Sequence, residues 1–327
     1  MNKNNKPSSH PKHSLKAAMN TMSNTHQTPK TTPESAPVPA PVLIGGIGET
    51  IADYDAYILD IWGVLHDGIN PYDGVLDCLL QMKAAGKEIL LLSNSPNRAA
   101  DVSARVLIPM GIHQGVHYDH IVTSGEATWT AMAAYKGQKA YGLWHAEKPT
   151  ALVGHDIALT TDIETADFVL GSLFPAGAKA EDYQHVLDRA LARGLPFICA
   201  NPDKIVNIGT DLHLCAGGVA DVYEAMGGTV HWYGKPYAPI YEQSLATLAV
   251  QDKSRILAIG DSLRTDVTGA CGFGIDVLWN LVGIHWEELR EQTPQGMIIN
   301  ADSLEKTLQT YKVRPSALLR GLKWTKS

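Results

Sequence analysis

The sequence contains few cysteines: four in 327 residues, at positions 78, 199, 215 and 271, with no C-x-x-C pair among them. Scattered thiols of this kind are expected to be free and buried, and they suit a reducing compartment. The sequence therefore predicts a cytoplasmic location.

Long hydrophobic runs and an excess of basic charge are also missing. The longest apolar runs, such as residues 89–92, are far shorter than the roughly 20 residues that cross a bilayer. The 34 acidic side chains outnumber the 27 of lysine and arginine, which gives a net charge of -7. These features argue against a membrane span and against nucleic acid as the main partner. With 45% hydrophobic residues, the chain can bury a sizeable core in one large or two modest domains.

Residues 1–42 differ in composition from the rest of the chain. They are rich in Pro, Ser, Thr, Asn and Lys, and the first acidic residue is Glu34. Such a segment has too little apolar surface to order itself, and it lacks the apolar stretch of a secretory signal. We expect a disordered extension, with Met19 or Met22 as an alternative start and organelle targeting as an alternative role.

From residue 51 onward, strand-like and helix-like segments alternate. Residues 57–59 and 88–92 are short apolar runs, and the stretch 75–85 between them has helical spacing and stops at Gly86. This strand–helix–strand order implies a right-handed crossover and a parallel sheet. The same pattern returns later, with a helix at 240–250 and strands at 256–259 and 276–279.

The segment between these two halves has an alternation of its own. We predict strands at 121–122, 151–153, 168–170 and 197–199, a helix opened by the capping pattern at Thr123, and another at 181–192. The fold class is therefore α/β, with a parallel-sheet core that is interrupted by a second α/β domain. The core takes residues 43–97 and 232–327, and the inserted domain takes residues 98–231.

Three of the apolar runs end abruptly in polar residues. Asp60 follows the first run, Ser93 and Asn94 follow the second, and Asp261 and Asp266 follow the run at 256–259. Buried parallel strands deliver such side chains at their carboxyl ends, so we expect them to meet at one edge of the sheet. A single aspartate after a strand is often only a turn residue. The repetition after a second strand is what indicates a site.

The residue types at this edge suit a metal and a phosphate. Carboxylates that meet repel each other unless a cation neutralises them, and Mg²⁺ takes one or two carboxylates together with waters and a phosphate oxygen. The Ser93 hydroxyl and nearby backbone N–H groups can hold oxygens of a transferred group. Lys235, in a turn bounded by glycine and proline, can offset charge on that group and on Asp60. A partly desolvated aspartate such as Asp60 suits a nucleophile or a metal ligand.

The ordered set of Asp60, Ser93, Lys235 and the stretch Gly-Asp-x-x-x-Thr-Asp at 260–266 resembles the four motifs of the haloacid dehalogenase superfamily. The insertion resembles the class IIA cap of that superfamily, because it carries an Asn-Pro-Asp turn at 201–203 and a Gly-Gly pair at 217–218. The best-known members of that class are nucleotide and sugar-phosphate phosphatases. The resemblance covers about residues 50–300.

This resemblance implies a Rossmann-like core, Mg²⁺ as cofactor and an aspartyl-phosphate intermediate on Asp60. It also implies the roles of the remaining site residues. The metal ligands are Asp60, Asp261, Asp266 and the backbone carbonyl of Trp62; Ser93, Asn94 and Lys235 bind the phosphoryl group; Asn201 and Asp203 of the cap help to shape the substrate pocket.

Trp62 is the departure from the family pattern. Phosphatases of this superfamily usually carry at this position a second aspartate, which protonates the leaving group and then activates water. An indole has one N–H and no basic lone pair, so it cannot replace that group. Its backbone carbonyl is retained, which leaves the metal site intact. His66 and Asp67 are alternative acids nearby, although the sequence does not fix their direction.

Three functions are consistent with these residues. The first is an Mg²⁺-dependent hydrolase of small phosphate esters, acting on a small phosphorylated metabolite as a monomer or a homodimer. The second is a catalytically impaired metabolite-binding or regulatory protein, which the tryptophan would explain. The third is nucleophilic hydrolysis of a carbon–halogen bond, against which the retained pair Asp261 and Asp266 argues, because extra carboxylates raise the pKa of a nucleophile.

Two other stretches allow more than one interpretation. The histidines at 113, 117 and 120 have spacing that suggests a zinc site but lack a fourth ligand in the run. Residues 316–324 carry leucines and a tryptophan among basic residues, which fits either an interaction helix or a terminal segment that docks on its own domain.

Overall fold

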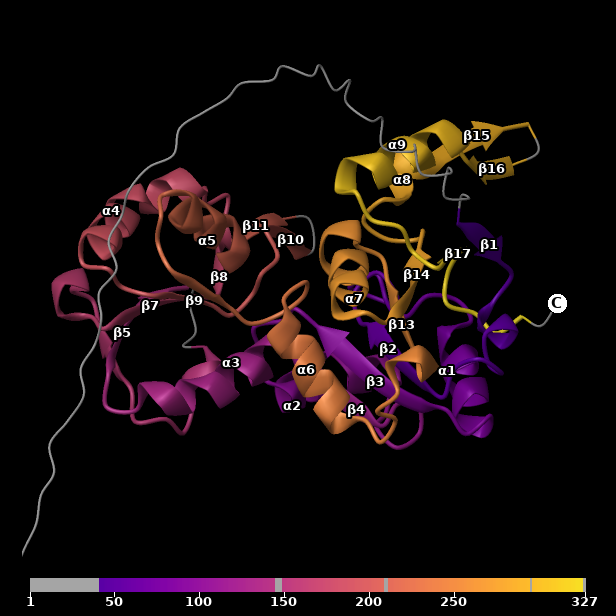
Figure 1. The fold of residues 1–327 in the computed structure, drawn as a ribbon, viewed down its shortest axis with the longest axis horizontal. Helices are drawn as coiled ribbons and strands as arrows, with labels where there is room; N and C mark the ends of the chain where they lie inside the picture. Colours follow the sequence, from indigo (N-terminus) through magenta and orange to yellow (C-terminus); the bar gives the residue numbers. More distant parts are fainter. Residues whose placement is uncertain (1–40, 145–148, 209–210, 295, 326–327) are drawn as a thin grey trace, which may run out of the picture. The chain divides into compact units, whose positions relative to one another are not determined.

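The computed structural model describes residues 41–144, 149–208, 211–294 and 296–325 (Figure 1). The predicted disordered tail, residues 1–42, lies almost entirely outside the described residues. Its last position differs from the prediction, because Val42 already belongs to strand β1 (Val42–Ile44). Among the described residues, no helix is both long enough and apolar enough to cross a membrane.

A seven-stranded sheet with parallel pairing throughout confirms the predicted α/β class. Its strand order is β1-β17-β14-β13-β2-β3-β4. The strands not yet bounded are β2 (Ala56–Asp60), β3 (Glu88–Ser93), β4 (His120–Thr123), β13 (Ile256–Gly260), β14 (Asp276–Asn280) and β17 (Ala317–Leu319).

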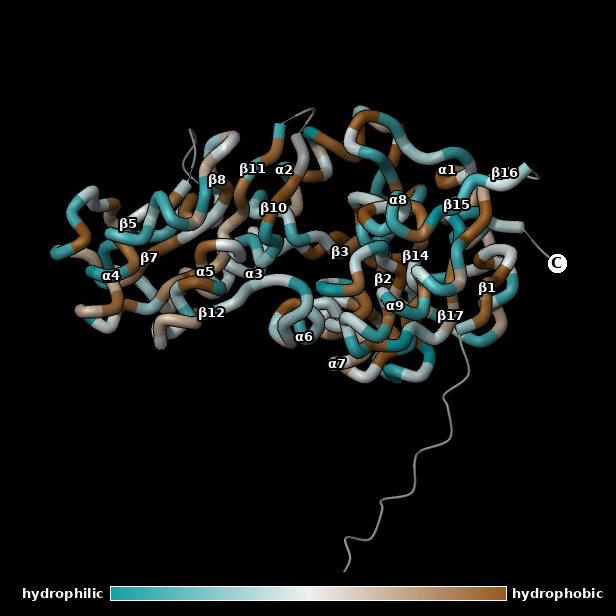
Figure 2. Tube along the Cα trace, turned by 90° about the horizontal axis from the view of Figure 1, so that it is seen from above, coloured by the Kyte–Doolittle hydropathy of each residue, from teal (hydrophilic) through white to brown (hydrophobic). Residues whose placement is uncertain are grey.

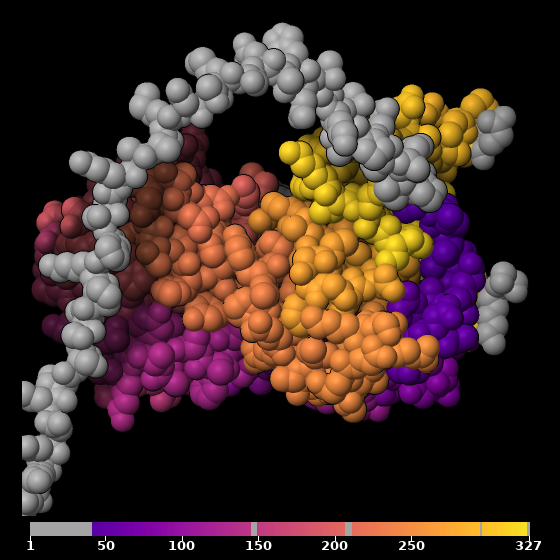
Figure 3. Space-filling model, viewed as in Figure 1, coloured from indigo at the N-terminus to yellow at the C-terminus, as the bar shows by residue number. Residues whose placement is uncertain are grey.

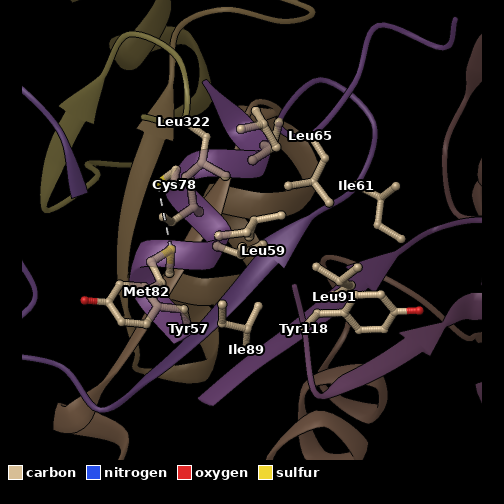
Figure 4. Close-up of a cluster of buried hydrophobic side chains, with 14 of the residues drawn as sticks. Tyr57, Leu59, Ile61, Leu65, Cys78, Met82, Ile89, Leu91, Tyr118 and Leu322 are labelled. Atoms are coloured by element: carbon tan, nitrogen blue, oxygen red, sulfur yellow. Dashed lines mark hydrogen bonds between the residues drawn. The ribbon is translucent and has the colours of Figure 1, made fainter. Parts of the chain in front are cut away.

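The central strands are apolar on both faces because both faces are covered. In β2, Tyr57 and Leu59 point into one buried cluster, whereas Ala56 and Ile58 point into another. Strands β3 and β13 alternate in the same way. Figure 4 shows the first of these clusters, and in Figure 2 the hydrophobic stretches run through the interior.

Helices cover the two faces of this sheet. Helix α1 (Val75–Ala84) packs on the first cluster, where the Cys78 thiol lies 3.9 Å from the sulfur of Met82 (Figure 4). The other cluster receives α6 (Ala238–Thr247), α7 (Thr268–Phe273) and α9 (Ala301–Tyr311). The fold is therefore a three-layered, Rossmann-like arrangement. Short helices α2 (Ala99–Val102) and α8 (Trp286–Leu289) and the hairpin β15 (Arg290–Thr293) and β16 (Gly296–Ile299) complete this part of the chain.

A second, five-stranded parallel sheet lies in the segment that was predicted to be inserted, although its strand β12 ends at Trp232, one residue past the predicted boundary. Its order is β12-β9-β7-β5-β6, formed by β5 (Lys139–Leu143), β6 (Ala158–Thr160), β7 (Phe168–Gly171), β9 (Phe197–Cys199) and β12 (Val230–Trp232). An antiparallel sheet of β8 (Leu173–Ala176), β10 (Ile205–Ile208) and β11 (Asp211–Cys215) accompanies it. The helices of this region are α3 (Ser124–Met132), α4 (Gln184–Ala192) and α5 (Ala216–Ala225).

Strand β4 differs from its predicted place. Residues 120–123 fall inside the range 98–231, yet β4 pairs with β3 as the edge strand of the first sheet. The division of the chain into a core and an inserted cap stays a prediction, but the change from one sheet to the other comes after β4 rather than at residue 98. The strand predicted at 151–153 is also wrong, because Thr150–Leu152 forms a short helical turn.

The C-terminal segment docks on its own sheet. Leu318, Leu319 and Leu322 are buried, and β17 lies between β1 and β14 in parallel register. In Figure 3 these C-terminal residues lie beside the N-terminal residues of the sheet. Of the two interpretations of residues 316–324, the docked segment is correct, and its residues Ala317–Leu319 form a strand.

Candidate active site

The predicted site residues come together at the carboxyl edge of the first sheet. Strands β13, β2 and β3 are neighbours in that sheet, and Asp60 and Ser93 are the last residues of β2 and β3. Asp261 directly follows the last residue of β13. Parallel strands end on the same side, so their terminal side chains face one shared position.

Three buried carboxylates form the centre of this site. Asp60, Asp261 and Asp266 each offer an oxygen, and these oxygens all lie within 4.8 Å of one another. Among the described residues, no other cluster of three His, Cys, Asp or Glu side chains has this spacing. The histidines at 113, 117 and 120 therefore form no such cluster. His120 instead contacts Glu88.

Lys235 provides the positive charge of the site. Its Nζ donates to Asp60 Oδ1 at 2.5 Å and to Asp266 Oδ1 at 2.6 Å, and the residue is only 3% exposed. Burial opposes the lysine charge, but the neighbouring carboxylates outweigh that effect and hold the pKa of Lys235 above its usual value. One lysine cannot neutralise three carboxylates, so a further cation is needed if all three are ionised.

The carboxyl groups respond to this shortage of positive charge. Burial, together with the charge of Asp266, raises the pKa of Asp60 well above its ordinary value, and the nearby Lys235 offsets only part of this. The same two causes raise the pKa of Asp261 to about 7. A bound divalent cation would favour the ionised forms of both groups.

Asp261 is held in place by backbone on two sides. A Cβ atom on Gly63 would lie 2.1 Å from Asp261 Oδ2, and one on Gly283 would lie 2.2 Å from it, so both positions need glycine. The backbone N–H of Ile284 donates to the same oxygen at 2.8 Å, and the indole N–H of Trp279 donates to the Asp261 carbonyl at 2.8 Å. These two partners could not be predicted from local sequence, because they lie 18 and 23 residues from Asp261 in the chain.

Asn94 positions Lys235. Its Oδ1 accepts the backbone N–H of Lys235 at 2.7 Å, and its Nδ2 donates to the Lys235 carbonyl at 3.0 Å. The Ser93 hydroxyl lies beside it and accepts the Ser95 N–H at 3.1 Å. The binding of phosphate by Asn94 stays a prediction, and its side chain is engaged in fixing the lysine turn.

The Asn-Pro-Asp turn reaches this site from the inserted segment. The N–H of Asp203 donates to the Asn201 side chain at 3.1 Å, and Asp203 Oδ1 accepts from Asn94 at 3.0 Å and from Arg264 at 3.3 Å. Burial raises the pKa of Asp203, although its hydrogen bond from Asn94 works in the opposite direction. Arg264 was not singled out in the sequence, although it lies between Asp261 and Asp266.

Trp62 has a partly exposed side chain, with 44% of its surface accessible. Its ring centroid lies 5.4 Å from that of His66, at an interplanar angle of 62°. A Cβ on Gly68 would lie 2.6 Å from the indole, so the glycine backbone packs directly against the ring. The indole is therefore fixed by the loop that follows it.

Neither alternative acid is well suited to proton donation. His66 is 1% exposed, its Nδ1 accepts the Gly68 N–H at 2.9 Å, and burial lowers its pKa. The neutral ring therefore carries its proton on Nε2, which is buried without a hydrogen-bond partner among the described residues and is a weak acid. Asp67 accepts the N–H groups of Asn70 and Ile69, and these bonds lower its pKa. A carboxylate stabilised in this way is ionised at neutral pH.

A hollow of about 450 Å³ lies at the opposite edge of the first sheet, where it is lined by Lys83, Asp119 and His120 among others. Its charges pair with each other, since Lys83 contacts Asp119 and His120 contacts Glu88. It is separate from the carboxylate cluster and has no comparable set of unneutralised groups.

Comparison with known proteins identifies the family. A family model described as haloacid dehalogenase-like hydrolase matches residues 57–158, and a HAD-hydrolase-like model matches residues 232–307. The crystal structure of a haloacid dehalogenase-like hydrolase from Brucella suis is 32% identical, covers 87% of this chain and 100% of its own, and superimposes with a TM-score of 0.71. The chain belongs to the haloacid dehalogenase-like hydrolase family.

Two phosphatases are also similar to this chain. An acid sugar phosphatase of Staphylococcus aureus is 25% identical over 71% of this chain and 88% of its own length. A p-nitrophenyl phosphatase from Archaeoglobus fulgidus shares the fold, with a TM-score of 0.63 and 22% identity over 82% of this chain and 97% of its own.

Proposed function

We propose that this protein is an Mg²⁺-dependent phosphatase that hydrolyses small phosphate esters through a covalent phosphate on Asp60. The observation that carries the proposal is the contact between Asp60 and Lys235 beside two further buried carboxylates. The acid sugar phosphatase relative supports the same reaction class. We also assign the chain to class IIA of the family, with the segment between β4 and α6, which carries the second sheet, as the cap, and with a cytoplasmic location.

The carboxylate cluster suits Mg²⁺. Its three carboxylates are hard oxygen donors, and together with Lys235 they leave negative charge unneutralised when ionised. Asp60, Asp261, Asp266 and the backbone carbonyl of Trp62 would hold the ion. When bound, Mg²⁺ supplies charge neutralisation and polarises a phosphate oxygen.

The protein groups then act in two steps. An oxygen of Asp60 attacks phosphorus, an Asp60–phosphate bond forms, and the bond to the leaving oxygen breaks with its electron pair. A water molecule next attacks the same phosphorus, which releases phosphate and restores the Asp60 carboxylate. Lys235 holds Asp60 in line and offsets charge on the phosphoryl oxygens, while Ser93 and nearby N–H groups bind those oxygens.

Substrate selection would fall to the Asn201–Asp203 turn. Asp203 reaches Asn94 and Arg264, so the inserted segment touches the phosphate end of the site. The substrate class is a small phosphorylated metabolite. The protein acts on it as a monomer or a homodimer.

A second candidate function is a metabolite-binding protein with negligible turnover. Trp62 favours it, because the usual acid of the family is missing and neither His66 nor Asp67 is arranged to replace it. The carbon–halogen alternative is less well supported, since the three clustered carboxylates suit a cation that such a reaction does not use.

Turnover of a panel of phosphate esters, with Mg²⁺ and with a chelator, separates these functions. The phosphatase should show Mg²⁺-dependent release of phosphate that is lost in Asp60→Asn and retained in Asp188→Asn, an exposed aspartate on α4. A binding protein should show no release, and Asp60→Asn should only tighten metal-free phosphate binding, because one repelling charge is removed.

A further inference from the structure

Asn280 carries a buried amide beside the candidate site. It is the last residue of β14, directly after Trp279, and is only 1% exposed. Its Nδ2 donates to the Gly63 carbonyl at 2.8 Å and to the Val282 carbonyl at 2.9 Å, and its Oδ1 accepts the Gly321 N–H at 2.9 Å. Both amide hydrogens are therefore used, and a flipped amide would place its oxygen against two carbonyls. The side chain has one favourable orientation.

Two of these contacts reach the backbone that packs against Asp261. Gly63 and Gly283, the residue after Val282, are the glycines on which a Cβ atom would collide with Asp261 Oδ2. The two glycines belong to segments that are far apart in the chain, and Asn280 is hydrogen-bonded to both segments. The amide therefore fixes the spacing of the two backbone segments that hold this carboxylate.

The same amide helps to fix the peptide that joins Trp62 to Gly63. That peptide contains the Trp62 carbonyl, which is a proposed Mg²⁺ ligand, and the Gly63 N–H, which donates to the His66 carbonyl at 3.0 Å. Gly63 has a φ of 85°, a left-handed conformation that favours glycine. Asn280 binds the carbonyl of this glycine, so both of its polar backbone groups are bonded. The direction of the Trp62 carbonyl is fixed in this way.

The sheet itself does not depend on the Asn280 side chain. The backbone already joins β14 to β17, because Asn280 pairs with Leu319 in parallel register and the Leu281 N–H donates to the Leu319 carbonyl at 2.8 Å. The side chain instead contacts three loop segments beyond the strand ends. A buried amide whose donors are all bonded specifies one arrangement of the groups around it. The arrangement that it specifies here is that of the loops around Asp261.

We propose that Asn280 is the positioning residue of the metal site and sets its affinity and selectivity for Mg²⁺. It acts through Asp261 and the Trp62–Gly63 peptide rather than as a ligand. This inference rests on the proposed function, since it takes over the Mg²⁺ ligands named there. Residues that orient metal ligands in this way typically contribute about 10–100-fold to metal affinity.

Mg²⁺ should respond more than Ca²⁺ to the loss of this amide. Mg²⁺ requires nearly octahedral ligands at about 2.0–2.1 Å, whereas Ca²⁺ accepts variable geometry at about 2.3–2.6 Å. Ligands that are held less firmly therefore weaken Mg²⁺ binding more than Ca²⁺ binding. If Asn280 only stabilised the fold, its loss would not discriminate between the two ions.

The test measures the Kd of each ion from the rise in Tm of the metal-free protein as Mg²⁺ or Ca²⁺ is added at pH 8. Asn280→Leu removes all three hydrogen bonds and should raise the Kd of Mg²⁺ about 10–100-fold, with a smaller rise for Ca²⁺. Asn280→Ser keeps one hydroxyl donor, which can hold at most one of the two carbonyls, so its effect should be smaller. The serine variant decides the question if the leucine variant does not fold.

Asn300 offers a matched control. Its side chain accepts the Ser303 N–H at 2.9 Å at the start of α9 and donates to Glu291 at 2.7 Å. Asn300→Ala removes this helix cap and should lower the free energy of unfolding. It should leave the Kd values of both ions unchanged, because neither partner belongs to the carboxylate cluster.

The inference would be overturned by an unchanged Kd for Mg²⁺ in folded Asn280→Leu, or in Asn280→Ser where only that variant folds. Equal weakening of Mg²⁺ and Ca²⁺ binding would also overturn it. Absence of Mg²⁺ binding by the unmodified protein would contradict both this inference and the metal dependence of the proposed function. Mg²⁺ binding without turnover of any phosphate ester would contradict the phosphatase function alone.

Discussion

The Asn94 side chain binds both polar groups of the Lys235 backbone, accepting its N–H at 2.7 Å and donating to its carbonyl at 3.0 Å. This arrangement fixes the lysine whose Nζ contacts Asp60 and Asp266. The end of β3 thus determines where the positive charge of the site lies.

Asn94→Ala should therefore reduce catalysis more than it reduces folding. Loss of these hydrogen bonds is expected to cost about 1–3 kcal/mol of stability, and displacement of Lys235 by about 1 Å can cost about 10²-fold in kcat. Kinetics and urea unfolding of the variant check this, with the exposed Gln309→Ala as control. Unchanged kcat in a folded Asn94→Ala protein would show that the turn holds Lys235 without this residue.

Lys235→Met should destabilise the metal-free protein strongly at alkaline pH. Removing one partner of a buried ion pair typically costs about 3–5 kcal/mol, because Asp60 and Asp266 keep unpaired charge. At lower pH the Asp60 carboxyl, whose pKa is raised by burial and by the charge of Asp266, can take up a proton, so the deficit relative to the unmodified protein should shrink. Chemical unfolding at several pH values measures this, and Lys306→Met, an exposed lysine on α9, should show no such trend.

Stabilisation by Mg²⁺ should increase with pH. The pKa of Asp261 is about 7 in the folded chain, owing to burial and Asp266, and about 4 when unfolded. The folded state therefore holds an extra proton between these values, so this contribution to metal-free stability is fully present below about pH 4 and is lost as the pH rises through about 7. Because Mg²⁺ competes with that proton, the rise in Tm that it causes should be small near pH 5.5 and large near pH 8. At a hundredfold excess over Kd, Mg²⁺ should add on the order of 2.7 kcal/mol to the free energy of unfolding near pH 8. A shift in Tm that is equal at both pH values would exclude Asp261 as a ligand.

The contacts of Asp203 should affect substrate use more than stability. Its ion pair with Arg264 spans 3.3 Å between side chains that are about one third exposed, so the pair itself contributes at most about 1 kcal/mol. Asp203→Asn keeps an oxygen for Asn94, whereas Asp203→Ala does not. The alanine variant should therefore raise KM more than the asparagine variant at similar Tm; identical kinetics in both would separate the turn from the substrate pocket.

Much of the site could be predicted from local patterns. Apolar runs that end in Asp60, Ser93 and the Gly260–Asp261 step indicated the edge of a parallel sheet, because buried strands leave few other places for such residues. The alternation of strands and helices likewise predicted the α/β class and a second sheet within residues 98–231.

Features that depend on distant contacts could not be predicted. Strand β4 is only four residues long, and its pairing with β3 has no local signature. The same holds for Trp279 and Ile284, which reach Asp261 from another loop, and for β17, which completes the sheet from the end of the chain. The orientation of His66 also depended on tertiary packing, because its burial and its edge-on contact with Trp62 follow from the fold of the loop.

The most direct measurement is chemical trapping of the covalent intermediate. The protein is mixed with an aryl phosphate and Mg²⁺, quenched in acid within one turnover and treated with borohydride, which converts phosphoaspartate to homoserine. Mass spectrometry of the peptide that contains residue 60 then locates the modification. We predict homoserine at position 60, dependent on substrate and Mg²⁺ and absent from Asp60→Asn. Turnover without any modification at position 60 would contradict the covalent mechanism.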